Sequence, residues 1–110
     1  MEQKKKIKIL LLEDSPGDAR LISELISESA PSDFLIRHVT LLKDALAELD
    51  SASGYDVVLS DLSVTDSSGV ETYRDLRGHA RKLPIIILSG NLDESMAISS
   101  VREGAQDYLV

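Results

Sequence analysis

Along the chain, runs of apolar residues of strand length alternate with stretches in which apolar residues recur at helical spacing. An uninterrupted run, such as Ile9 to Leu12, is typical of a strand that is buried on both faces. The pattern predicts strands at residues 7–12, 34–39, 56–60, 85–89 and 107–110. It predicts helices at 41–49, 70–77 and 94–103, and an earlier helix that begins at Ser15 and breaks at Ala30.

Apolar residues in the first two predicted helices share one side, as expected for helices that pack on a core. They are Ala19, Ile22, Leu25 and Ile26 in the first helix, and Leu42, Ala45, Leu46 and Leu49 in the second. Asn91, which acidic residues follow, is suited to cap the start of the last predicted helix. Gly104 is suited to end that helix in a left-handed conformation.

Strands that alternate with helices predict an α/β fold, in which a parallel sheet carries helices on both faces. We expect a flavodoxin-like, doubly wound sheet of five strands in the order 2-1-3-4-5. Because parallel crossovers are right-handed, the first helix then covers one face alone and the later helices cover the other. Ligands of such sheets bind beyond the carboxyl ends of the strands, where the strand order reverses.

The 110 residues are enough for one domain with a single core. The net charge of −7 argues against a general nucleic-acid-binding face, and we interpret the Lys4–Lys6 cluster as a solvated tail. The absence of cysteine excludes disulfides and thiolate metal sites. No apolar run approaches the ~20 residues that span a bilayer and no signal-peptide pattern opens the chain, so we expect no membrane association and a cytoplasmic location.

Polar residues follow or end three strands whose carboxyl ends meet at one edge of the predicted sheet. Glu13 and Asp14 come directly after the first strand, Asp61 follows the third, and Ser89 ends the fourth. The first and third strands are neighbours in the expected order. We therefore expect the three carboxylates to converge on one crevice.

Converging carboxylates repel one another, and two unit charges ~4 Å apart cost about 4 kcal/mol at an effective dielectric constant near 20. Either one carboxyl group stays protonated or a cation lies among the groups. Oxygen ligands without nearby histidine or cysteine favour Mg²⁺, with Ca²⁺ and Mn²⁺ left open. A Mg²⁺ ion with few protein ligands keeps water that a phosphate can replace, which points to phosphoryl chemistry. The alternative is that Glu13 and Asp14 only cap the first helix and Asp61 only forms a turn.

Four stretches resemble the receiver domain of two-component response regulators, of the CheY-like superfamily, and the resemblance covers essentially the whole chain. They are LLLEDSPGDARLI, DVVLSDLSVTDSSGVE, PIIILSG and GAQDYLV. The resemblance implies that Asp61 is the phospho-accepting aspartate. It also implies that Asp14 and Asp61 bind Mg²⁺ directly, that Glu13 binds it through water, and that the backbone carbonyl of Ser63 is a further ligand.

The same resemblance implies a function in a phosphorelay. Asp61 would accept a phosphoryl group from a phosphohistidine of a sensor histidine kinase or phosphotransfer domain, with Mg²⁺ as the cofactor. Ser89 resembles the hydroxyl residue that turns toward the phosphoryl group, and Tyr108 the aromatic residue that changes rotamer with it. Ser63 and Asn91 would tune the lifetime of the aspartyl phosphate. Such a domain is not an enzyme in the usual sense: it promotes its own phosphorylation and dephosphorylation and then changes its surface conformation.

The chain departs from the family pattern in two places. Thr65 stands where the family usually has proline, which loosens the turn after Asp61. The family's lysine and last helix would follow Val110, so we interpret the chain as part of a longer protein.

Without that helix, we expect the apolar surface formed by alternate residues of strands 57–59 and 85–88 to be exposed to solvent. We expect association through this face, by dimerisation or by exchange of an element, and poor phosphorylation without the lysine.

Two other classes of function remain open on the sequence. A haloacid-dehalogenase-like phosphatase also places a nucleophilic aspartate after a parallel strand, but it needs a second aspartate where this chain has Ser63. A receiver-like interaction module that is never phosphorylated needs none of the polar residues at the sheet edge. We interpret His38 and His79 as ordinary residues of a strand and a polar loop, not as phospho-donors.

Overall fold

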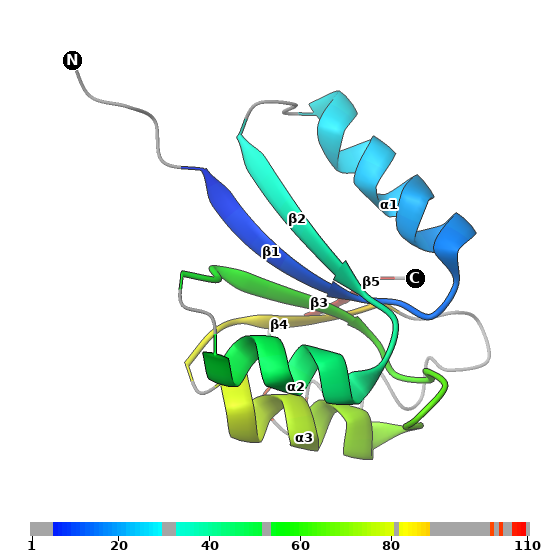
Figure 1. Cartoon of the computed structure of the whole chain (residues 1–110), viewed down its shortest axis with the longest axis vertical. Helices are drawn as coiled ribbons and strands as arrows, with labels where there is room; N and C mark the ends of the chain where they lie inside the picture. The colour runs from blue at the N-terminus through cyan, green and yellow to red at the C-terminus, as the bar shows by residue number, and fades with distance from the viewer. Residues whose placement is uncertain are drawn as a thin grey trace.

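A computed structural model describes residues 6–29, 33–51, 54–80, 82–88, 102, 104 and 107–109 of the chain. In this part, five strands form one parallel sheet in the order β2-β1-β3-β4-β5, and three helices pack on it (Figure 1). The strands are β1 (Ile7–Leu12), β2 (Phe34–Val39), β3 (Val57–Asp61), β4 (Ile85–Leu88) and β5 (Asp107–Leu109). The helices are α1 (Pro16–Ser29), α2 (Leu42–Ser51) and α3 (Val70–Ala80).

The predicted α/β class and the strand order 2-1-3-4 are confirmed, and β5 extends the sheet beyond β4. β1 lies between β2 and β3, and its residues from Ile9 to Leu12 are buried. This explains why the first apolar run of the sequence is uninterrupted, because both faces of the strand are covered. Ile7, at the outer end of the strand, is 42% exposed.

Two apolar layers lie on opposite faces of the sheet (Figure 1). α1 covers one face, where Ala19, Ile22 and Ile26 pack with Leu11 and Leu59. α2 and α3 lie side by side on the other face, over a larger core whose strand residues are Leu10, Leu12, Val39, Val58, Ile85 and Ile87. The predicted division, with the first helix alone on its face, is confirmed for the described helices.

The apolar layer on the α1 face extends to Val57, Ile86 and Leu88, which are only half-buried. These are alternate residues of β3 and β4, as expected for this face from the sequence, and the structure shows which ones they are. Their placement is confirmed. Association through this face remains a prediction.

α1 begins where the sequence predicts it, at the N-cap Ser15. The Oγ of Ser15 accepts a hydrogen bond from the backbone N–H of Asp18 at 3.3 Å. Pro16 occupies the first helical position, where its missing N–H costs no hydrogen bond. The prediction that Leu25 faces the core was wrong. Leu25 lies on the outer side of the helix with Leu21, four residues earlier, and each is 55% exposed.

The predicted bounds of β1 and β2 are confirmed, whereas those of α2, β3 and α3 differ from the prediction by one to three residues. The largest difference is in α3, which continues from residue 77 to Ala80 because Ala80 is buried in the core. His79 therefore lies on this helix and not in a loop, and its Nδ1 is 2.7 Å from Oδ1 of Asp50 on α2. β3 includes Asp61, and the described part of β4 ends at Leu88.

Part of the predicted last helix, 94–103, lies outside the described residues, and so does its proposed cap Asn91. Gly104 has a φ of 121°, a positive value that favours glycine, in agreement with the prediction for this position. Within the described ranges, no helix is both long enough and apolar enough to cross a membrane.

Candidate metal centre

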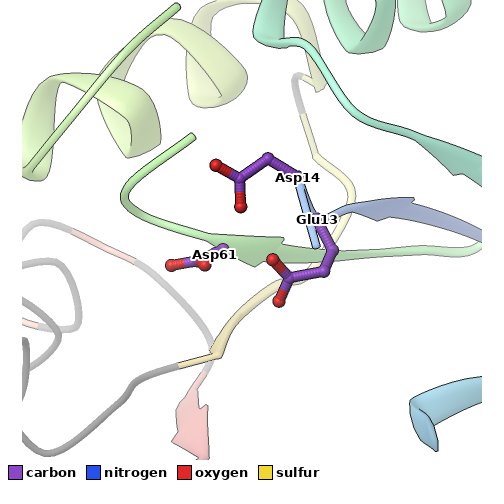
Figure 2. Close-up of side chains that lie close together, drawn as sticks. All are labelled: Glu13, Asp14 and Asp61. Carbon is purple, nitrogen blue, oxygen red and sulfur yellow. The ribbon is translucent and has the colours of Figure 1, made fainter. Parts of the chain in front are cut away.

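Three acidic side chains meet at the carboxyl ends of β1 and β3 (Figure 2). Glu13 and Asp14 directly follow β1, and Asp61 is the last residue of β3. One carboxylate oxygen of each residue lies within 4.8 Å of those of the other two. The two strands pair up to Leu12 and Ser60, so the residues that follow come out side by side. The predicted convergence of the three carboxylates is therefore confirmed.

Glu13 is the most buried member of the cluster, with 5% of the residue exposed, whereas Asp14 and Asp61 are half-buried. The Oε2 of Glu13 accepts a hydrogen bond from the backbone N–H of Ser15 at 3.2 Å. This bond links the Glu13 carboxyl group to the residue that caps α1. The N-cap of α1 is Ser15, and the alternative that Glu13 and Asp14 only cap this helix does not account for the approach of Asp61.

The burial of Glu13 changes its acidity. Burial raises the pKa of Glu13 from 4.5 to about 7, and the negative charge of Asp61 and hydrogen bonding to Asp14 and Asp61 add to the rise. The hydrogen bond from the N–H of Ser15 acts in the opposite direction. In the absence of a cation, Glu13 therefore holds a proton below about pH 7, and this proton relieves part of the repulsion. A divalent cation would take over this role and displace the proton.

The loop that begins at Asp61 is fixed by several hydrogen bonds. The Oδ1 of Asp61 accepts one from the backbone N–H of Ser63 at 3.1 Å. The C=O of Asp61 accepts one from Oγ of Ser60 at 2.7 Å. Thr72 of α3, which is completely buried, donates its hydroxyl to the C=O of Leu62 at 2.7 Å. The first bond holds the Asp61 carboxylate at the edge of the sheet, and the other two fix the backbone of the loop beside it.

The remaining predicted site residues are placed in part. Ser63 is half-buried and lies two residues after Asp61, and the role of its carbonyl as a ligand remains a prediction. Tyr108 lies on β5 opposite Ile87 of β4, but its side chain is outside the described part of the structure. Ser89 and Asn91 are outside it entirely.

Three residues that support the cluster were not identified from the sequence. Thr72 and Asp66 hold the loop after Asp61, and His38 contacts the backbone of Glu13. Only His38 had a sequence signal, because it lies near the end of the predicted strand 34–39, which is the neighbour of the strand that precedes Glu13. The contacts of the other two depend on how the helices pack.

The residues of the cluster fit a hard divalent cation. All three side chains offer carboxylate oxygens, which Mg²⁺ and Mn²⁺ bind in proteins. Among the described residues, no other group of three or more His, Cys, Asp or Glu side chains could hold a metal ion. The arrangement can hold a cation beside Asp61 and present that carboxylate as a nucleophile.

The chain matches the family described as response regulator receiver domain over residues 9–110. It is 32% identical over 108 residues to the methanogenesis regulatory protein FilR1 of Methanothrix harundinacea, a match that covers 93% of this chain and 23% of that protein. It is 30% identical over 103 residues to the cell cycle transcriptional regulator CtrA of Caulobacter vibrioides, over 94% of this chain and 43% of that protein. The chain thus spans less than half the length of these curated relatives.

Solved structures of similar chains have the same fold. The phosphorylated cyanobacterial phytochrome response regulator RcpA aligns with a TM-score of 0.81 at 26% identity, over 96% of this chain and 80% of that chain. A response regulator receiver domain protein of Clostridium thermocellum aligns with a TM-score of 0.79 at 25% identity, over 94% of this chain and 80% of that chain.

Proposed function

Because the chain belongs to the response regulator receiver domains, the phospho-acceptor modules of two-component signalling, we propose that Asp61 accepts a phosphoryl group from a partner histidine kinase. The observation that carries the proposal is the position of Asp61. It ends a buried parallel strand, and its carboxylate lies within 4.8 Å of those of Glu13 and Asp14. The donor is a phosphohistidine of the kinase or of a phosphotransfer domain.

In the proposed reaction, a carboxylate oxygen of Asp61 attacks phosphorus. The new O–P bond forms as the P–N bond to the donor histidine breaks, and the imidazole leaves with the electron pair. The transition state is loose and in line, so positioning and charge stabilisation are the main contributions of the protein. The hydrogen bond from the N–H of Ser63 to Oδ1, and that from Ser60 to the Asp61 carbonyl, hold the nucleophile in place.

The proposal assigns the acidic cluster to a Mg²⁺ ion, with Mn²⁺ as a substitute. Asp14 and Asp61 bind the ion directly, Glu13 binds it through water, and the backbone carbonyl of Ser63 is a further ligand. When bound, the ion neutralises charge on the transferring phosphoryl group. The donor set of three carboxylates supports this assignment.

We assign the conformational response to residues on and after β4 and β5. Ser89 directly follows β4 and is proposed to donate its hydroxyl to the phosphoryl group. Tyr108 lies on the neighbouring strand β5 and is proposed to change rotamer in response. Ser63 and Asn91 are proposed to set the lifetime of the aspartyl phosphate. A change in the surface around these two strands is the proposed output.

Phosphorylation by a small donor tests the proposal. The protein is exposed to acetyl phosphate or phosphoramidate with Mg²⁺, and the acyl phosphate is located by borohydride reduction and peptide mass spectrometry. We expect modification at Asp61 that is lost in Asp61→Asn and without Mg²⁺. Asp50→Asn, which changes an exposed aspartate on α2, should be modified as the wild type is. Modification at another residue would contradict the assignment, and no modification under any condition would favour an interaction module that is never phosphorylated.

We also propose that residues 1–110 form one receiver domain and that this domain acts in the cytoplasm.

A separate proposal is that two copies of the chain associate through the α1 face, near Val57, Ile86 and Leu88. Sedimentation velocity over a range of protein concentrations tests this proposal. A monomer at every concentration would contradict the association without affecting the role of Asp61.

A further inference from the structure

The backbone of Glu13 is held on both sides by the end of β2. Its N–H donates a hydrogen bond to the C=O of Val39, with N and O 3.1 Å apart. Its C=O lies 2.7 Å from Nε2 of His38. Glu13 is the first residue after β1, so these two contacts continue the connection between β1 and β2 past the end of the strand.

The contact between His38 and Glu13 has a defined direction. A carbonyl oxygen only accepts hydrogen bonds, so Nε2 of His38 carries a proton and donates it. The ring is half-buried, and strand alternation places it on the same face of the sheet as Ile36, the face that α1 covers. The imidazole of His38 has no role in the proposed phosphoryl transfer, although it contacts the backbone of Glu13 directly.

We propose that His38 is a positioning residue of the metal centre, an inference that rests on the metal-dependent function proposed above. The C=O of Glu13 belongs to the planar peptide group that joins Glu13 to Asp14, so a fixed carbonyl also fixes the start of Asp14. His38 thereby sets the direction in which the side chains of Glu13 and Asp14 extend from the backbone toward Asp61. The imidazole itself contacts neither the cation nor the phosphoryl group, and it acts only by orienting the ligands.

The affinity for Mg²⁺, measured by isothermal titration calorimetry on the whole chain, tests this role. His38→Leu removes the donor, and we expect the affinity to fall about tenfold. His38→Gln carries an N–H donor at the end of a side chain of similar reach and should recover most of the affinity. His79→Leu is the matched control, because it removes the other histidine of the chain, which contacts Asp50 and not the acidic cluster.

A double-mutant cycle in metal-free protein gives an independent measurement. If His38 directs Glu13 and Asp14 toward Asp61, then Asp61→Asn should raise the melting temperature more in the wild-type background than in His38→Leu. A lower melting temperature of His38→Leu with unchanged Mg²⁺ affinity and no coupling to Asp61 would overturn the proposal and leave His38 a packing role. If the wild-type chain binds no Mg²⁺, the proposed function fails, and the metal-free cycle alone decides the role of His38.

Discussion

The carboxylate of Asp66 caps α2, since its Oδ1 accepts a hydrogen bond from the backbone N–H of Leu42 at 2.7 Å. Its Oδ2 accepts a second bond from the N–H of Lys43 at 3.0 Å. Both N–H groups belong to the first turn of a helix, where they have no partner within the helix. The cap comes from the loop after β3, so the segment that follows Asp61 is attached to the start of α2.

Removing this cap should destabilise the protein. We expect Asp66→Ala to lower the free energy of unfolding by about 1 kcal/mol, the usual effect of losing a helix cap, and Asp66→Asn to lower it less. Denaturation in urea measures the difference. Asp75→Ala, which changes an exposed aspartate on α3, is the control and should have an effect within about 0.5 kcal/mol of zero. An Asp66→Ala variant as stable as this control would contradict the capping role.

The effect of Asp66 should also depend on pH. Burial acts to raise the pKa of Asp66, but the hydrogen bonds from Lys43 and Leu42 outweigh it and lower the pKa below its ordinary value of 3.8. A carboxyl group with a lowered pKa stabilises the fold above its unfolded-state pKa, and this contribution is lost on acidification. The difference between wild type and Asp66→Ala should therefore shrink as the pH falls below ~4.

Glu13 should give the opposite dependence on pH in metal-free protein. Its pKa is raised to about 7, so its contribution to stability is complete below 4.5 and is lost as the pH rises through about 7. Glu13→Gln has no such proton to lose. We therefore expect the melting temperature of the wild type to fall relative to Glu13→Gln between ~pH 5 and ~pH 8, as followed by circular dichroism. A constant difference over this range would show that Glu13 titrates as an ordinary carboxyl group.

Thr72 should be important for stability through its hydroxyl group and not through its shape. The hydroxyl donates to the C=O of Leu62 and lies 2.7 Å from Oγ of Ser67. Thr72→Val keeps the shape but removes both contacts from a completely buried position, which should cost about 1–3 kcal/mol of unfolding free energy. Thr72→Ser keeps the hydroxyl and should cost less. Equal stability of the valine variant and the wild type would mean that this hydrogen bond does not stabilise the loop.

Much of the site could be predicted because it depends on local sequence pattern. The apolar run that ends at Leu12 and the run before Asp61 are strong strand signals, and a parallel order that makes these strands neighbours brings their terminal acids together. Ser15 and Pro16 likewise define the start of α1 within a few residues of sequence. In these cases the interacting residues are adjacent in the chain or related by the regular geometry of the sheet.

The supporting contacts could not be predicted in the same way. Asp66 caps a helix whose first residue lies 24 positions earlier, and only the packed arrangement of loop and helix brings them together. The outward position of Leu25 depends on which part of α1 meets the sheet, since Leu25 directly precedes the core residue Ile26 and is equally apolar. α3 continues through Gly78, normally a poor helix residue, because the burial of Ala80 outweighs the local preference.

The balance between repulsion and cation binding at Asp61 gives the most direct test of the acidic cluster. At an effective dielectric constant near 20, two unit charges about 5 Å apart repel by roughly 3 kcal/mol, and protonation of Glu13 relieves only part of this. Asp61→Asn removes one charge and keeps the shape of the side chain, so we expect it to raise the melting temperature of metal-free protein by several degrees.

Saturating Mg²⁺ should raise the melting temperature of the wild type but have little effect on that of Asp61→Asn, because this variant lacks a direct ligand of the ion. Asp50→Asn should behave as the wild type does in both measurements. If neither Mg²⁺ nor Asp61→Asn changes the melting temperature, the three carboxylates do not form a metal site.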